Sequence, residues 1–358
     1  MTTHPTLIAI FGATGTGKTT FVNDASGGTL EVGHDLQACT QDVALSNGFQ
    51  VDGRDVGLID TPGFDDTELS DTEILLRISG FLSSTSPHGY EAGHKLTGII
   101  YLHRITDDRM GAISRRTFRI FRELCGQKNL SNVLIVTNKW SNPPSEAHVK
   151  RQEQLRKDTR YFQPAIKAGA QLVRRLHKDT ASAHDIIRML LNMNPVVMKV
   201  QQELVDNRQG FFTTGAAQVL GEELVNAEKR HEDEIAQVKE ELRKAKEEKD
   251  AETQQDLREF LEQAKIESSR LAKEIEALRH GFDEERARWE NRIDAANRER
   301  DAAEKREFEL YEQLEELRRQ AELAREEDKW IFQKKIDELT EVIKVIKNNS
   351  KSWGCIVM

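Results

Sequence analysis

The stretch that decides the fold is Gly12-Ala13-Thr14-Gly15-Thr16-Gly17-Lys18-Thr19, near the start of a 358-residue chain. It follows the apolar run 7–11 and fits the pattern G-x-x-x-x-G-K-[ST]. Between a buried strand and a helix, such glycines let backbone N–H groups turn inward around phosphate oxygens, and the positive end of the helix faces them. The alternative is a flexible glycine-rich turn. The strand before the loop and the helix after it favour a phosphate-binding loop (P-loop).

The side chains of this loop suit a nucleotide triphosphate. Lys18 supplies a positive charge for the β- and γ-phosphates, and the Thr19 hydroxyl can ligate Mg²⁺. We therefore expect the loop and the start of its helix to bind the nucleotide, through Gly12, Thr14, Gly15, Thr16, Gly17, Lys18, Thr19 and Thr20.

A second motif, Asp60-Thr61-Pro62-Gly63, closes the predicted strand 56–59. At this place Asp60 would reach Mg²⁺ through water, and Gly63 would offer its N–H to the γ-phosphate. Loss of that phosphate would release the loop, which is how a nucleotide switch works. Alone, the motif also suits a Pro-Gly turn at the end of a strand. Beside a P-loop, it predicts the second half of a nucleotide site.

The composition divides the chain into two parts. All seven prolines lie at or before Pro195, and after Gly221 the only glycines are Gly281 and Gly354. In the first part, short apolar runs alternate with helical patterns, which predicts an α/β fold with a mostly parallel sheet flanked by helices. The expected strands are 7–11, 56–59, 97–102 and 133–137, the expected helices are 71–82 and 112–124, and a weaker final unit pairs a strand at 173–177 with a helix at about 183–191.

In the second part, apolar residues recur at spacings of four and three, with Glu, Lys and Arg between them. The three series are Leu271, Ile275, Leu278 and Phe282; Leu310, Leu314, Leu317, Ala321 and Ala324; and Phe332, Ile336, Leu339, Ile343 and Ile346. This pattern predicts a long α-helical coiled coil, with breaks near 289–293 and at Asp328. A helix from Leu224 to Ile346 would extend roughly 180 Å. The alternative is a single solvated helix, which the many large apolar residues disfavour.

The remaining composition excludes several classes of protein. A formal net charge of −9 argues against a nucleic-acid binder, because affinity for phosphate backbones needs clustered Lys and Arg. Three cysteines, Cys39, Cys125 and Cys355, make no disulfide framework and indicate a reduced, cytosolic protein. We find no signal peptide and no apolar run near the 18 or so residues that cross a bilayer.

Membrane contact is expected from the segment Cys355-Ile356-Val357-Met358 instead. It fits the C-a-a-X prenylation box, and Met in the last place favours a farnesyl group on Cys355. A single prenyl chain binds membranes only marginally, so a parallel coiled-coil dimer that places two lipids side by side would strengthen anchoring. The alternative is an accidental tail. The prediction is a homodimer, peripheral on the cytosolic face of a membrane.

Together the motifs resemble those of the TRAFAC-class GTPases, and within that class the septins and the immunity-associated (avirulence-induced-gene) GTPases. The resemblance covers about residues 6–195 and rests on GATGTGKTT, ACTQDV, LIDTPGFDD, IVTNKWS and DTASAHDI. It implies a P-loop NTPase G domain that binds GTP or GDP with Mg²⁺ and hydrolyses GTP. We therefore expect a G domain at 1–200, a connector at 201–222, the coiled coil at 223–347 and the tail at 348–358.

The resemblance also implies roles for the groups around the γ-phosphate. Thr40 matches the switch threonine that closes on Mg²⁺ and the γ-phosphate, although an ordinary surface threonine is the alternative. The implied metal ligands are then Thr19, Thr40 and, through water, Asp60. The implied catalytic groups are Lys18, Thr40 and Gly63.

The base site is implied by two further matches. Asn138 and Lys139 match the first half of the N-K-x-D motif, in which the Lys stem lies along the plane of the base. Ser182 and Ala183 match the loop whose backbone meets the guanine oxygen, with a simple helix cap as the alternative for Ser182.

Two residues depart from the family pattern. Ser141 stands where an Asp normally accepts two hydrogen bonds from guanine, so we expect a reduced preference for guanine. Phe64 stands where Ras-like enzymes carry a Gln that orients the attacking water, so we expect slow hydrolysis. His94, His103 and Arg109 are candidates to replace that Gln, although packing or surface roles are favoured for them.

The expectation is therefore a GTP-binding, slowly hydrolysing switch that acts through protein partners. The alternative is a catalytically inactive nucleotide-binding scaffold.

Overall fold

The computed structural model describes residues 6–28, 30, 42–64, 66, 69–84, 90, 94–107, 112–247, 251–323 and 329–353. The chain divides into two compact units, residues 1–287 and residues 288–358. The boundary between the units falls within a long helix.

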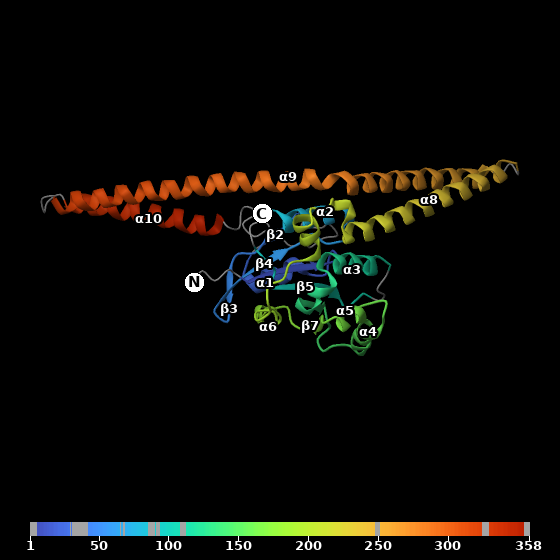
Figure 1. Ribbon diagram of the computed structural model, residues 1–358, viewed down its shortest axis with the longest axis horizontal. Coiled ribbons are helices and arrows are strands. Elements are labelled where there is room, and N and C mark those ends of the chain that lie inside the picture. The colour runs from blue at the N-terminus through green and yellow to red at the C-terminus, as the bar shows by residue number, and fades with distance from the viewer. Residues whose placement is uncertain are drawn as a thin grey trace. The chain divides into compact units, whose positions relative to one another are not determined.

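The first unit is built on a twisted, mostly parallel sheet (Figure 1). Its strands are β1 Thr6–Gly12, β2 Ala44–Leu45, β3 Phe49–Val51, β4 Arg54–Asp60, β5 Gly98–Arg104, β6 Val133–Asn138 and β7 Gln171–Arg174. Within the described ranges the order is β2-β4-β1-β5-β6-β7, and β3 also pairs with β4. The strands β4, β1, β5, β6 and β7 are parallel, whereas β2 and β3 run antiparallel to β4. The α/β fold expected from the sequence is confirmed.

The helices of the first part of the chain connect these strands. They are α1 Lys18–Ser26, α2 Asp71–Ser83, α3 Ala112–Cys125, α4 Glu146–Lys157, α5 Gln163–Lys167, α6 Thr180–Arg188 and α7 Lys199–Gln201, with short turns η1 Gln127–Asn132, η2 Gln202–Asp206 and η3 Phe211–Thr213. Local sequence sets their starts. At α2, for example, the Ser70 hydroxyl accepts from the Glu73 N–H while the Glu73 carboxylate accepts from the Ser70 N–H.

The sheet is buried on both faces, as its continuous apolar strands require. On one face Ile8 joins a cluster that includes Phe21 of α1 and Ile187 of α6. On the other face the Phe11 ring packs on Phe121 of α3, with ring centroids 5.3 Å apart. The P-loop at the end of β1 therefore follows a strand that is buried on both faces.

The last strand–helix unit differs from the expectation. β7 ends at Arg174, not at His177, and α6 begins at Thr180. Leu176 is apolar, which extended the predicted strand, but its side chain is 41% exposed in a loop. The helix begins early because the Asp179 carboxylate accepts from the Ser182 N–H and caps it.

Three long helices follow: α8 Gly215–Glu247, α9 Ala251–Leu323 and α10 Lys329–Trp353. A continuous helix from Leu224 to Ile346 is wrong, because the start of α9 contacts the end of α8. The Gln254 side chain donates to Ala245 O at 3.1 Å, whereas residues nine apart in one helix are separated by about 13 Å along its axis. In the first unit Leu278 of α9 is fully buried, and a Cβ at Gly221 of α8 would lie 3.5 Å from it.

The second unit contains another helix pair. Leu314 of α9 and Ile336 of α10 are buried in one cluster, with Leu310, Leu317 and Leu339 packed against it. The interruption of the repeat expected near 289–293 does not end the helix, since α9 runs through it. Asp328, the other expected break, lies outside the described residues.

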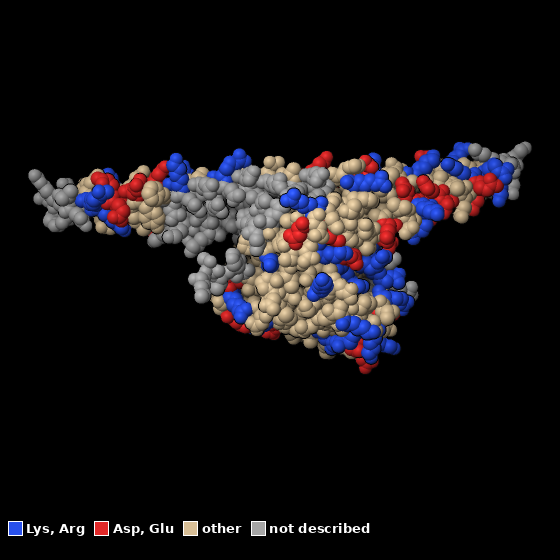
Figure 2. Space-filling model, viewed as in Figure 1, with Lys and Arg blue, Asp and Glu red and all other residues tan. Residues whose placement is uncertain are grey.

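On the face shown in Figure 2, charged side chains of both signs lie along the described parts of these helices. Several pair along the helix at spacings of three or four, including Arg243 with Glu240 and Arg270 with Glu267. No helix within the described ranges combines the length and apolarity that a membrane span needs.

Candidate nucleotide-binding site

The loop between β1 and α1 has the backbone that its glycines predict. Gly12, Gly15 and Gly17 have φ angles of 145°, 74° and 95°, in the region that side chains disfavour. A Cβ at Gly12 would lie 2.4 Å from Leu102 O, and one at Gly17 would lie 2.8 Å from Asn138 Nδ2. Only glycine fits this close approach of β1, β5 and β6 at the carboxyl end of the sheet.

Lys18 lies inside this loop, and its side chain is buried. Its Nζ donates to Gly12 O at 3.1 Å and to Ala13 O at 3.2 Å. Burial lowers the pKa of the Lys18 amine to about 8, and the nearby carboxylates of Asp60 and Asp66 oppose this shift. A phosphate group placed in the loop would add the negative charge that favours the protonated amine.

Thr19 and Asp60 meet at the start of α1. The Thr19 hydroxyl donates to Asp60 Oδ2 at 2.6 Å, and Asp60 is fully buried at the end of β4. Hydroxyl and carboxylate oxygens are the hard ligands that Mg²⁺ prefers, and Mg²⁺ usually takes only one or two protein ligands beside water and phosphate. Where the structure describes the chain, no group of three or more His, Cys, Asp or Glu could form a separate metal cage. The pair Thr19–Asp60 therefore fits Mg²⁺ next to a nucleotide.

Gly63 brings the second motif against the P-loop. A Cβ there would lie 2.4 Å from Thr14 Oγ1 and 2.7 Å from Lys18 Nζ. The Thr14 hydroxyl donates to Gly63 O at 3.1 Å, and the Thr14 N–H donates to Phe64 O at 2.8 Å. The two motifs are thus adjacent, as a γ-phosphate sensor requires.

Asp66 was missed by the sequence reasoning. Its Oδ2 accepts from the Thr14 hydroxyl at 3.1 Å, and its charge is close enough to affect Lys18. Asp66 is the last residue of the LIDTPGFDD match, but no role was assigned to it from the sequence. Phe64, in contrast, is buried, and its ring contributes no polar group to the site.

The remaining loop threonines are also placed at the site. Thr16 is buried, and its hydroxyl donates to Ala13 O at 2.9 Å. Thr20 is half-buried in the first turn of α1.

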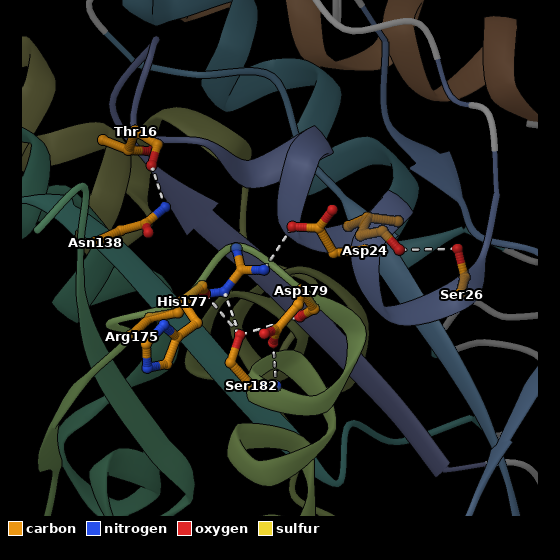
Figure 3. A network of polar contacts seen from close by, with 9 residues as sticks. Thr16, Asp24, Ser26, Asn138, Arg175, His177, Asp179 and Ser182 are labelled. Atoms are coloured by element: carbon orange, nitrogen blue, oxygen red, sulfur yellow. Dashed lines mark hydrogen bonds and ion pairs between the residues drawn. The ribbon is translucent and has the colours of Figure 1, made fainter. Parts of the chain in front are cut away.

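Asn138 and Lys139 lie at the end of β6, beside the P-loop. The Asn138 side chain donates to Thr16 O at 3.1 Å and so joins β6 to the loop (Figure 3). Lys139 follows with a φ of 61°, and its side chain is exposed. Burial of part of its stem, with the charges of Arg104 and Lys178, lowers the pKa of Lys139.

Ser141 does not replace the missing Asp. Its hydroxyl accepts from the Ser145 N–H at 2.9 Å, and so stabilises the turn before α4. Its neighbour Trp140 donates to Thr137 O at 3.1 Å, and the Arg174 guanidinium lies over its ring at 4.9 Å. Ser141 therefore offers at most one weak acceptor, instead of the two carboxylate oxygens of the usual Asp.

The geometry does not support the roles expected for Ser182 and Ala183. The Ser182 N–H donates to Asp179 Oδ1 at 2.8 Å, and the Ala183 N–H donates to Asp179 O at 3.3 Å. Both amides are engaged in the first turn of α6, and Ala183 is buried in the core. Residues 176–178, in the loop after β7, are exposed.

The other candidates divide into two groups. His103 is buried against the Phe162 ring at 5.4 Å, and burial lowers its pKa to about 4, so it has a packing role. His94 is half-buried before β5. Thr40, Arg109 and Cys355 lie outside the described residues.

Comparison with known proteins agrees with this geometry. Residues 7–139, from β1 to the base motif, match the family described as 50S ribosome-binding GTPase. This part of the chain is a P-loop GTPase domain. Domains of this kind bind GTP or GDP with Mg²⁺, which the P-loop hydroxyl and the Asp of the neighbouring strand hold. No curated protein matches the chain.

Solved structures show similarity in fold alone. Toc33 from Arabidopsis thaliana, in complex with Mg²⁺ and GMPPNP, is 16% identical, with 54% of this chain and 88% of that chain covered and a TM-score of 0.39. The elongation factor SelB from Methanococcus maripaludis is 13% identical, with coverages of 56% and 36% and a TM-score of 0.34. The cytosolic domain of the T. maritima FeoB iron transporter is 13% identical, with coverages of 55% and 66% and a TM-score of 0.31.

Proposed function

We propose that the protein is a GTP-binding switch that hydrolyses GTP slowly. The observation that carries the proposal is the Thr19–Asp60 contact of 2.6 Å beside the buried Lys18 amine, in a glycine-lined loop. It joins two hard oxygen ligands and a cation at one end of the sheet. This is the set of groups that a Mg²⁺-bound triphosphate needs.

Each group of the chain has a distinct task in this proposal. The amides of the loop and Lys18 bind the phosphates and stabilise the charge that develops during phosphoryl transfer. Thr19 and Asp60 would hold Mg²⁺, which when bound neutralises phosphate charge. The Gly63 N–H would report the γ-phosphate to α2, which begins eight residues later at Asp71.

Slow turnover follows from Phe64. The residue after Gly63 is a buried phenylalanine, so it cannot hold a proton acceptor or orient a water for attack. The same observation favours the second candidate, a nucleotide-binding scaffold without catalysis.

Single-turnover hydrolysis separates these two functions. The intact chain is loaded with GTP or ATP and Mg²⁺, and phosphate release is compared with that of Lys18→Ala. Tight GTP binding with slow release supports the switch, and tight binding without release supports the scaffold. Tight binding of ATP in preference to GTP would contradict the guanine assignment.

The magnesium ligands have their own test. Asp60→Asn and Thr19→Val should weaken Mg²⁺-dependent GTP affinity by about tenfold or more, because each removes one hard oxygen contact to the metal. Isothermal titration with and without Mg²⁺ measures this change. Exposed Ser141→Ala is the control and should retain the Mg²⁺ effect. Equal Mg²⁺ dependence in all variants would rule out this metal site.

We also propose that the C-terminal helices form a homodimer. In the second unit the helix pair leaves Phe308 64% exposed and Trp330 67% exposed. The helix pair already has its own buried cluster, and these two large apolar side chains lie outside it. Exposed apolar side chains of this size indicate a surface that binds a partner. A second copy of the chain is the partner proposed.

Membrane attachment through a farnesyl group on Cys355 completes the proposal. It is supported by the C-a-a-X pattern of Cys355 to Met358. Mass spectrometry of the protein from eukaryotic cells would show the lipid, and Cys355→Ser should lose it and move to the soluble fraction. Unchanged membrane partition of Cys355→Ser would refute the anchor.

A further inference from the structure

The inference concerns Arg175, whose side chain is fully buried although it carries a charge. Arg175 follows β7 and begins the loop that leads to α6. Its Nη2 donates to Asp24 Oδ2 at 2.6 Å (Figure 3). Its guanidinium also lies over the Phe21 ring at 4.9 Å. Asp24 and Phe21 belong to α1, the helix that begins at Lys18. One side chain therefore joins the loop after β7 to the helix of the P-loop.

Further contacts fix both ends of this loop. The Arg175 N–H donates to Thr137 O at 2.9 Å, directly before Asn138. The Ser182 hydroxyl donates to His177 O at 2.7 Å, and Arg175 Nε approaches the same hydroxyl at 3.4 Å. Figure 3 shows Arg175, His177, Asp179 and Ser182 converging on this point. The loop backbone is held at the same end of the sheet as Asn138.

Stability alone does not explain a buried arginine here. Replacing a buried ion pair by apolar side chains of similar volume is often neutral or stabilising. Arg175 Nη1 is buried and has no hydrogen-bond partner in the part of the chain that the structure describes, and an unsatisfied donor destabilises the folded state. The guanidinium fork provides fixed geometry, with two nitrogens directed at α1 and at α6.

The part of the site that would hold the nucleobase needs a loop that is fixed in position. The Ser141 hydroxyl accepts a hydrogen bond in the turn before α4. The amides of Ser182 and Ala183 donate to Asp179 at the start of α6. Residues 176–178 are exposed beside the end of β6, where Lys178 is close enough to affect Lys139. Their backbone is an exposed polar surface at this end of the sheet, available to a base edge.

We propose that Arg175 is a positioning residue for the nucleobase: its bridge to Asp24 holds loop 176–178 in the place where that loop contacts the base. The proposal rests on the proposed nucleotide-binding function. In this proposal the ion pair of buried Arg175 with Asp24 supports the part of the GTP affinity that depends on the base.

The test compares GTP with inorganic tripolyphosphate, each with Mg²⁺, on the intact chain. The dissociation constant of tripolyphosphate divided by that of GTP measures how much the nucleoside adds to the affinity. Arg175→Met should lower this ratio by about tenfold, as expected for the loss of one or two hydrogen bonds, while tripolyphosphate affinity stays within about twofold. Arg188→Met is the matched control, because Arg188 at the end of α6 forms an exposed ion pair with Asp52, between β3 and β4, and this variant should keep the ratio.

A double variant guards against loss of folding. Arg175→Met with Asp24→Leu replaces the ion pair by an apolar pair, and should fold while keeping the low ratio. Recovery of the wild-type ratio in this double variant would overturn the proposal, because packing alone would then place the loop. A wild-type ratio near one would also overturn it and leave the phosphate site intact. Failure of both ligands to bind would overturn the proposed function itself.

Discussion

Lys18 carries its charge where water hardly reaches, since only 6% of the residue is exposed. Burial lowers its pKa to about 8 from the ordinary value of 10.5. Between these values the unfolded chain binds more protons than the folded chain, so the contribution of Lys18 to the free energy of unfolding rises with pH. Below a pH of about 8 Lys18 is protonated in the folded chain, and burial of this charge lowers the free energy of unfolding by its full amount. This decrease is on the order of 3 kcal/mol.

Lys18→Met should therefore stabilise the nucleotide-free protein, by up to about 3 kcal/mol near pH 7, while it abolishes GTP binding. The gain in stability over wild type should shrink as the pH rises from about 8 to 10.5, because wild-type Lys18 then loses its proton. Urea unfolding of both proteins at several pH values, without phosphate, measures this difference. Exposed Lys167→Met is the control, and a pH-independent gain for Lys18→Met would contradict the argument.

At the scale of elements, α2 connects the Asp60–Gly63 motif to the rest of the domain. Its first turn is fixed by the reciprocal hydrogen bonds of Ser70 and Glu73, both 3.2 Å long. Such a capping box satisfies two backbone donors that the helix itself cannot satisfy. A movement of Gly63 on binding or loss of the γ-phosphate would therefore reach a helix whose first turn is fixed by these two hydrogen bonds.

Ser70→Ala should destabilise the protein by about 1 kcal/mol and increase hydrogen exchange in the first turn of α2. Hydrogen exchange followed by mass spectrometry, combined with urea unfolding, measures both effects. Ser145→Ala removes the equivalent cap of α4, where the Ser145 hydroxyl accepts from the His148 N–H, and should affect α4 instead. Unchanged exchange in α2 of Ser70→Ala would show that tertiary packing alone fixes this turn.

The sequence predicted those elements whose signal is local. The P-loop glycines are recognisable because the backbone there excludes a Cβ, and β1 because both of its faces are buried. The sequence could not reveal the end of β7, because exposed Leu176 continues the apolar pattern of the strand. It also could not show that Asp179 caps α6 and engages the amides of Ser182 and Ala183. Asp66 and Arg175 were missed because their roles depend on contacts with residues distant in sequence.

At the scale of the whole chain, the periodic helices show what a repeat pattern leaves open. A seam such as Leu310, Leu314 and Leu317 must be buried, but the pattern is the same whether the partner is another chain or the next helix. In the second unit α10 of the same chain covers this seam. The proposed dimer must therefore use the outer surface, where Phe308 and Trp330 are exposed.

Phe308→Glu with Trp330→Glu should therefore convert the proposed dimer to a monomer. Two buried apolar side chains are worth roughly 1.5–3 kcal/mol each, and each copy would contribute both. Sedimentation equilibrium of the intact chain over a range of concentrations measures the change, and helicity by circular dichroism should stay constant because neither residue belongs to the buried cluster. Met189→Glu, at an exposed apolar residue of the G domain, is the control. A dimer that survives the double substitution would place the contact between copies elsewhere, and a monomeric wild type would remove the dimer from the proposed function.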